Sequence, residues 1–231
     1  MGRQSFFSAA MRRREFLRRV AAGALGAGGA SAFLANALAK GDISAPQGIA
    51  RLEGTATVNG AAARLGTAVS ARDKVVTGPG SMAVVVVKDD AFLMREGTRI
   101  EFSEVNGALS QVVVANGRLL SVFGTRKEGL KIQARDASIG IRGTGAYLEI
   151  EPERVYFCLC YGAALIESPG MAPRSLTTRH HEQPLFLSAS GGTMALVPGP
   201  FRNHSDDELI LLESLVGREP PFLKDPNIPR Y

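Results

Sequence analysis

The sequence has few of the residues from which catalytic sites are usually built. It contains two cysteines and three histidines in 231 residues. It lacks a G-x-S-x-G nucleophile elbow, a phosphate-binding glycine loop, an H-E-x-x-H zinc motif and a dinucleotide-binding glycine pattern after a strand. It also lacks the C-x-x-C-H motif that attaches a c-type haem. These absences exclude several common enzyme and cofactor classes and favour a protein without catalytic activity.

Basic charge is not in excess once the first 39 residues are set aside. The chain has 27 basic and 22 acidic residues, a formal net charge of +5. Six of the basic residues and one of the acidic residues lie in residues 1–39, so residues 40–231 hold 21 of each sign. That part of the chain has no net charge with which to attract phosphate, and we expect no nucleic-acid partner.

Residues 1–39 have the layout of an export signal. Arg13-Arg14 precedes a variable residue and the apolar pair Phe16-Leu17, which resembles the twin-arginine export motif. An uncharged stretch follows, and Ala37-Leu38-Ala39 offers the small-x-small pattern that a signal peptidase cleaves. We predict a cleaved twin-arginine signal peptide over residues 1–39, a linker over residues 40–47 and a periplasmic or otherwise exported location.

An uncleaved membrane anchor is the alternative interpretation of the uncharged stretch. Its many glycines and alanines make it weakly apolar beside an ordinary spanning helix. We therefore favour cleavage and expect no membrane span in the mature protein.

From Gly48 the sequence lacks a helical period until about Ser205. Short apolar runs alternate with turn signals, as in a β protein. The run Met82–Val87 is continuously apolar, which predicts a strand buried on both faces. The hairpin dipeptide Asn-Gly occurs three times, at residues 59–60, 106–107 and 116–117. The pattern predicts an all-β fold, either a sandwich or a rolled sheet.

Several short motifs in this region occur in an order that resembles the FecR-type domain. They include Gly-Ile-Ala-Arg-Leu-Glu-Gly at residues 48–54 and Ile-Gly-Ile-Arg-Gly-Thr at residues 139–144. The second motif holds Arg142, Gly143 and Thr144, which match the signature of that family. The resemblance spans residues 48–167 and leaves residues 168–231 as a C-terminal extension.

The resemblance implies an all-β module that is not a catalytic fold. Such modules occur in periplasmic parts of iron-transport signalling proteins and in other exported proteins. It therefore implies a non-enzymatic binding, sensing or scaffold module with a protein or cell-envelope partner. Because no second membrane span follows the domain, we do not expect a transmembrane regulator. Arg142 could bind an anion, but a guanidinium hydrogen-bonded to nearby carbonyls is the simpler interpretation.

The C-terminal extension carries one strong helix signal. Ser205 and Glu208 form a capping box, in which each side chain bonds the backbone N–H of the other residue. We predict a helix over residues 206–216. Its leucines and isoleucine are too numerous for a free surface helix, so we expect it to dock on the sheet or on another subunit.

Both cysteines lie in one short stretch, Cys158-Leu159-Cys160. In a strand, side chains alternate between faces, so Tyr156, Cys158 and Cys160 should share one face. Two small buried thiols in the core are the simplest interpretation. A disulfide between them would be strained, because residues two apart on a strand are about 6.5–7 Å apart at Cα.

A soft-metal site is the second hypothesis for the two cysteines. All the histidines follow them in the chain, at His180, His181 and His204, and thiolates with imidazoles suit zinc or copper. Adjacent histidines on a strand point to opposite faces, so we expect only one of His180 and His181 to reach the thiols.

A thiol enzyme is the third hypothesis. Cys158 or Cys160 would be the nucleophile, and His180 or His181 the base. Against it, neither cysteine lies near a helix N-terminus or a basic residue that would lower its pKa.

Overall fold

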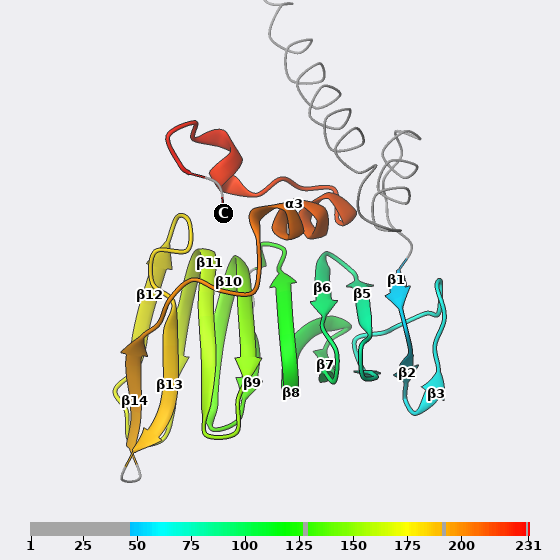
Figure 1. The fold of residues 1–231 in the computed structure, drawn as a ribbon, viewed down its shortest axis with the longest axis horizontal. Coiled ribbons are helices and arrows are strands. Elements are labelled where there is room, and N and C mark those ends of the chain that lie inside the picture. The colour runs from blue at the N-terminus through cyan, green and yellow to red at the C-terminus, as the bar shows by residue number, and fades with distance from the viewer. Residues whose placement is uncertain (1–46, 127–128, 191–192, 230) are drawn as a thin grey trace, which may run out of the picture. The chain divides into compact units, whose positions relative to one another are not determined.

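The structure is a computed structural model that describes residues 47–126, 129–190, 193–229 and 231. Within these residues the chain forms a fourteen-stranded sheet, one α-helix and one 3₁₀ turn (Figure 1). The predicted all-β fold with a C-terminal helix is confirmed. The predicted signal peptide, and the linker apart from residue 47, lie outside the described residues. The strands are β1 Gly48–Glu53, β2 Ala56–Val58, β3 Ala61–Ala62, β4 Lys74–Thr77, β5 Met82–Val87, β6 Asp90–Met94, β7 Arg99–Val105, β8 Ala108–Val122, β9 Leu130–Ala134, β10 Ala137–Ile150, β11 Arg154–Glu167, β12 Arg174–Thr178, β13 Leu185–Ser190 and β14 Thr193–Pro198.

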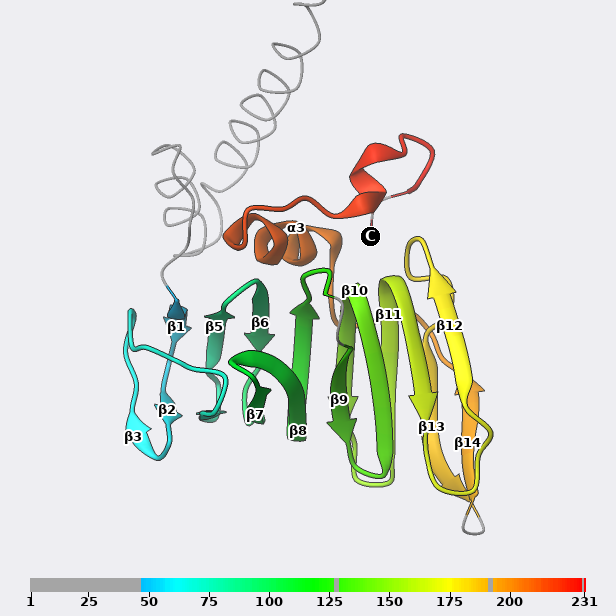
Figure 2. The ribbon, with the colours of Figure 1, turned by 180° about the vertical axis from the view of Figure 1, so that it is seen from behind.

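Three long strands, β8, β10 and β11, connect two layers of the sheet. The C-terminal half of β8 pairs with β6 and β10, whereas its N-terminal half pairs with β7 and, in parallel, with β9. In the same way β11 pairs first with β13 and then with β12, while β10 lies beside it along its length (Figure 2). One layer is therefore β1-β5-β6-β8-β10-β11-β13-β14, and the other runs from β3 and β2 through β4, β7, β8, β9, β10 and β11 to β12.

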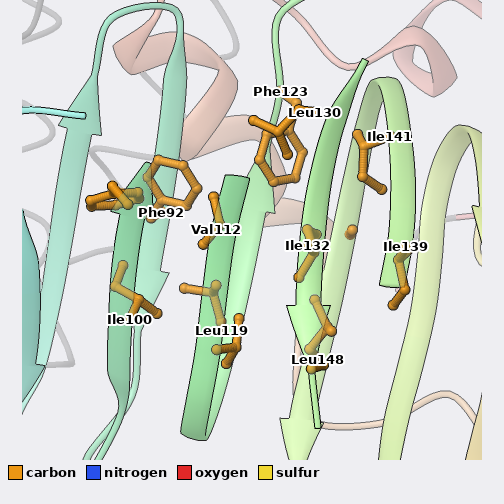
Figure 3. Packing of buried hydrophobic residues seen from close by; sticks show 14 of the residues in the cluster. Phe92, Ile100, Val112, Leu119, Phe123, Leu130, Ile132, Ile139, Ile141 and Leu148 are labelled. Carbon is orange, nitrogen blue, oxygen red and sulfur yellow. The ribbon is translucent and has the colours of Figure 1, made fainter. Parts of the chain in front are cut away.

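The main hydrophobic core lies between the two layers. Figure 3 shows its centre, where Phe92 and Leu119 of the first layer meet Ile100, Val112 and other residues of the second. The opposite face of the first layer is also apolar and is covered by the C-terminal extension. Strand β5 therefore lies between two apolar cores. Its residues alternate between them, with Ala83, Val85 and Val87 in the main core and Val84 and Val86 in the second. The prediction that residues 82–87 are buried on both faces is confirmed for Ala83 to Val87.

Helix α3, Asp206–Leu215, packs on β6 and β8 near the strand ends drawn at the top of Figure 1, and its buried leucines belong to the second core. The predicted capping box is present, with the Ser205 hydroxyl accepting from Glu208 N–H and the Glu208 carboxylate accepting from Ser205 N–H. Leu209, Leu212 and Leu215 point into the second core, as the apolar sequence of the helix predicts. A 3₁₀ turn at Pro221–Lys224, which the sequence analysis did not predict, places Phe222 on the same face. In the described part of the chain, no helix is both long and apolar enough for a membrane crossing.

The Asn-Gly dipeptides have two different structural roles. At residues 59–60 and 106–107 both residues have positive φ and join neighbouring strands, as predicted. The prediction of a hairpin at residues 116–117 is wrong, because both residues lie inside β8. Gly117 has φ 90° and lies against the backbone of Thr98, where β8 passes from one layer to the other.

The Arg142–Thr144 motif forms an irregularity in β10. The pairing of β10 with β11 shifts in register between Arg142 and Gly145. Gly143 has φ 54°, Thr144 is buried, and its carbonyl accepts from Phe123 N–H at 2.9 Å. Arg142 itself is exposed. The motif thus shapes the bend by which β10 joins the two layers.

Candidate metal centre

The two cysteines lie on the face of β11 that the C-terminal extension covers. Val155, Phe157 and Leu159 point into the main core, whereas Cys158 and Cys160 point into the second core. The alternation predicted for this strand is confirmed. Both cysteines are free thiols and are fully buried. The disulfide considered from the sequence is not formed.

A tight turn brings His181 back to this face. Strand β12 pairs with β11 up to Thr178 opposite Gly162, and the chain then turns. His181 has φ 54°, and its N–H donates to the carbonyl oxygen of Cys160 at 2.9 Å. The turn is closed by Arg179 N–H, which donates to Glu182 at 2.7 Å. His181 therefore lies beside the cysteines although it follows them by more than twenty residues.

His204 reaches the same place from the segment before α3. Its ring stacks on Tyr147 of β10, with centroids 4.4 Å apart and planes at 21°. Asn203, with φ 60°, donates from its side chain to Glu149 at 2.6 Å, and Arg202 forms an ion pair with the same carboxylate. Glu149 is itself buried and also accepts from the Tyr147 hydroxyl at 2.6 Å. This polar network fixes the segment that carries His204.

Four of the five candidate metal ligands converge into one group. Cys158, Cys160, His181 and His204, here called the Cys2His2 cluster, each offer one ligand atom, and these atoms all lie within 4.8 Å of one another. Cys158 Sγ is 3.5 Å from His181 Nδ1, and His181 Nδ1 is 3.2 Å from His204 Nε2. All four residues are buried.

His180 lies outside the Cys2His2 cluster and faces a carboxylate instead. Its Nε2 is 2.8 Å from Asp206 Oδ1. This placement agrees with the expectation that only one of His180 and His181 reaches the thiols. The expectation was based on the alternation of side chains along a strand, and neither histidine lies in a strand. Both residues follow β12 in a turn, where the positive φ of His181 removes the alternation of a strand.

The outer ring nitrogens of both cluster histidines have hydrogen-bond acceptors. His204 Nδ1 donates to the Arg202 carbonyl oxygen at 2.7 Å, and His181 Nε2 donates to Asp206 Oδ1 at 3.2 Å. These bonds leave the lone pairs of His204 Nε2 and His181 Nδ1 pointing toward each other. Two lone pairs 3.2 Å apart repel each other unless a proton or a cation lies between them.

The protonation of the cluster favours metal binding. Burial lowers the pKa of His181, so its ring is neutral at pH 7, the form that binds a metal. The Cys160 thiol lowers the pKa of Cys158 to about 6 against the effect of burial, and His204 acts in the same direction. Burial and the neighbouring Cys158 raise the pKa of Cys160. One thiolate is thus available near neutral pH, and a cation would stabilise the second.

Asp206 is the residue at this site that the sequence analysis missed. It is the first residue of the helix predicted over residues 206–216, where an acidic side chain suits the positive helix end without any partner in the core. In the structure it is 1% exposed and contacts both His180 and His181. The signal in the sequence was its position two residues after His204, at the start of an apolar helix.

His204 also borders a hollow that opens to solvent. The hollow has a volume of about 490 Å³, and Arg95, Arg118 and Glu208 lie on its rim.

Comparison with known proteins does not identify the chain. No protein-family model matches it. A search of curated proteins gives no match. Among solved structures, it is similar to two crystal structures of candidate anti-sigma factors from Parabacteroides distasonis. The first, at 1.65 Å resolution, shares 13% identity over 68% of this chain and 79% of that chain, with a TM-score of 0.47. The second, at 2.50 Å, shares 12% identity over 54% of this chain and 59% of that chain, with a TM-score of 0.45. Similarity at this level carries no argument about function.

Proposed function

We propose that this protein is a non-catalytic β module in which one zinc ion fixes the C-terminal extension to the sheet. The ligands are the four side chains of the Cys2His2 cluster. The observation behind the proposal is the convergence of four buried ligand atoms from three separate segments of the chain. These segments are β11, the turn after β12 and the residues that precede α3.

Two distances within the cluster are close to those of a tetrahedral zinc ion. With Zn–N of about 2.05 Å and Zn–S of about 2.3 Å, ideal geometry places two nitrogens about 3.4 Å apart and a sulfur and a nitrogen about 3.6 Å apart. The corresponding distances here are 3.2 Å and 3.5 Å. Two thiolates and two imidazoles are also a common ligand set of structural zinc sites. Copper is the other metal that these ligands suit.

The ligand count argues for a structural site. A catalytic zinc site keeps one position open for water or substrate, whereas here four protein side chains fill a tetrahedral shell. All four are buried between the sheet and the C-terminal extension. The ion would therefore act as a cross-link within the fold.

A thiol enzyme is the second function that the geometry suggests. Cys158, His181 and Asp206 follow one another at 3.5 Å and 3.2 Å, in the order of a nucleophile, a base and an orienting acid. However, Cys158 has no exposed surface. In addition, His204 Nε2 lies 3.2 Å from His181 Nδ1, the nitrogen that would have to act as the base. A nucleophile must contact its substrate, so this arrangement favours metal binding.

Metal content tests the proposal directly. We expect protein purified from the cytosol of cells supplied with zinc to carry about one equivalent, measured by elemental analysis. The double variant Cys158→Ser/Cys160→Ser should lose it. His180→Gln is the matched control, because it replaces a buried histidine outside the cluster with a side chain whose amide can still donate to Asp206, and it should keep the metal. Less than about a tenth of an equivalent of zinc, copper or iron in the unmodified protein would refute the metal site.

Cobalt substitution supplies a second measurement that does not depend on the variants. Cobalt(II) bound by two thiolates and two imidazoles in a tetrahedral site gives strong visible absorption and sulfur-to-metal charge transfer. We expect both in the unmodified protein at one equivalent of cobalt. A weak spectrum typical of octahedral cobalt would contradict the proposed geometry.

We also propose that the module acts outside the cytoplasm, as a binding, sensing or scaffold unit with a partner in the cell envelope. The proposal is supported by the twin-arginine pattern of residues 13–17 and by the FecR-type resemblance of residues 48–167, which stay predictions. Fusion of residues 1–47 to a folded reporter tests export. Arg13→Lys/Arg14→Lys should abolish it, while Arg18→Lys/Arg19→Lys should not. Equal export by both fusions would contradict the assignment.

A further inference from the structure

We propose that Asp206 is a positioning residue that makes His181 bind the metal through Nδ1 and that links the metal centre to the start of α3. This inference rests on the proposed zinc site. Asp206 is not a member of the Cys2His2 cluster, and its hydrogen bond to a cluster residue is the one to His181.

The carboxylate of Asp206 is held by several donors. Its Oδ1 accepts from His180 Nε2 at 2.8 Å and from His181 Nε2 at 3.2 Å. Its Oδ2 accepts from Tyr231 N–H at 2.9 Å. The backbone N–H of Asp206 donates to the Tyr231 carbonyl oxygen, also at 2.9 Å. A buried carboxylate that accepts from three N–H donors is held in a fixed orientation.

The two cluster histidines present different nitrogens for a structural reason. His204 gives its Nδ1–H to a backbone carbonyl, so Nε2 faces the cluster. His181 gives its Nε2–H to Asp206, so Nδ1 faces the cluster. The carboxylate fixes the tautomer of His181 and makes the opposite nitrogen more basic, which strengthens a metal bond.

His180 satisfies the same carboxylate without joining the cluster. Its ring lies among Phe222, Tyr231 and His181, with centroids 4.6, 5.2 and 4.6 Å away. Helix α3 begins at Asp206, two residues after His204. The same residue thus connects a metal ligand, the first turn of the helix and the segment at Tyr231, so metal affinity and docking of the extension should be coupled.

A second cation is the competing interpretation of these contacts. His180, His181 and Asp206 bring three possible ligand atoms together. In that case Asp206 would be a ligand, His181 would bridge two ions and the protein would bind two equivalents. The 2.8 Å between His180 Nε2 and Asp206 Oδ1 is the length of an N–H···O hydrogen bond and is shorter than the about 3.4 Å between two ligand atoms of a tetrahedral zinc ion, which favours one ion and an orienting carboxylate.

The test compares Asp206→Asn with Asp207→Asn in the full chain. Both variants remove one acid from the first turn of α3, but Asp207 is exposed. Zinc affinity is measured by competition with a chromophoric chelator. We expect Asp206→Asn to bind one equivalent about 10–100-fold more weakly, as for other partners of metal-bound histidines, and Asp207→Asn to bind like the unmodified protein.

A measurement on the unmodified protein keeps the inference testable if Asp206→Asn fails to fold. Long-range ¹H–¹⁵N spectra of the histidine rings show which nitrogen carries the proton and which binds the metal. In the zinc form we expect His181 protonated at Nε2 and bound through Nδ1, and His204 protonated at Nδ1 and bound through Nε2. The opposite pattern for His181 would overturn the inference.

The outcomes separate the two proposals. Absence of bound zinc in the unmodified protein removes the zinc site itself. One bound equivalent, with the same affinity in Asp206→Asn and Asp207→Asn, leaves the site and removes the role of Asp206. Two bound equivalents, one of them lost in Asp206→Asn, would make Asp206 a ligand and overturn the inference.

Discussion

Residues with positive φ decide where the chain of this protein can bend. Asn59-Gly60 and Asn116-Gly117 are the same dipeptide, yet the first closes a hairpin and the second lies inside β8. The difference is the environment of the glycine. A Cβ on Gly60 would meet nothing within 4 Å, whereas a Cβ on Gly117 would lie 2.4 Å from Thr98 Cα.

This pair of glycines gives a prediction with an internal control. Gly60 and Gly117 have φ of 84° and 90°, so alanine costs similar backbone strain at both, about 1–3 kcal/mol. At Gly117 the new methyl group also overlaps backbone, which adds about 1–3 kcal/mol. Chemical denaturation should show a clearly larger loss of stability for Gly117→Ala than for Gly60→Ala. Equal losses would mean that β8 can move away from Thr98.

Helix α3 shows why an element needs a partner surface. Its sequence was too apolar for a free helix, and in the structure one face contacts β6 and β8. Two polar side chains add to the attachment. The Tyr161 hydroxyl of β11 donates to Glu213 of the helix at 2.5 Å, and Arg218, which follows the helix, donates to the Asp89 carbonyl oxygen between β5 and β6 at 2.6 Å.

Alanine substitution of two adjacent leucines separates docking from helix propensity. Leu212 is fully buried, whereas Leu211 is only partly buried. Alanine favours the helix slightly over leucine, so any loss must come from packing. We expect Leu212→Ala to lower the free energy of unfolding by about 2–5 kcal/mol, and Leu211→Ala to lower it by less than half of that. Similar losses, measured by urea unfolding, would contradict the docking of α3 through its Leu212 face.

At the scale of the whole molecule, the second face of the first layer needs the C-terminal extension as a cover. That face is apolar from β5 to β11, and residues 201–228 pack on it. The Cys2His2 cluster lies where the cover meets the sheet. A bound ion would therefore stabilise the covered state, because the four ligands meet only when the extension is docked.

Removal of the metal should then loosen the extension before the rest of the fold. At a free zinc concentration of about 1,000 times Kd, the ion adds about 4 kcal/mol, so a chelator should lower Tm by about 8–16 °C. Amide hydrogen exchange should increase in residues 179–182 and 202–215, but not in β4 and β7 of the other layer. The Cys158→Ser/Cys160→Ser variant is the control, and its Tm should not respond to chelator. An unchanged Tm in the unmodified, zinc-loaded protein would contradict the cross-link.

The features that depend on local period follow from the amino-acid sequence alone. The two-residue alternation of β11 placed Cys158 and Cys160 on one face, and the capping box placed the start of α3. The continuous apolar run of β5 predicted a strand between two cores. Each follows from residues that are neighbours in the chain.

Which distant residues meet depends on how the layers and the C-terminal extension pack. The prediction of a turn at Asn116-Gly117 failed because backbone contact with Thr98, and not the dipeptide, sets the conformation there. His181 rather than His180 faces the thiols because its positive φ and its bond to Cys160 turn it inward. Asp206 is buried only because α3 docks on the sheet. Contacts between residues more than twenty positions apart depend on how the layers pack, which no local pattern encodes.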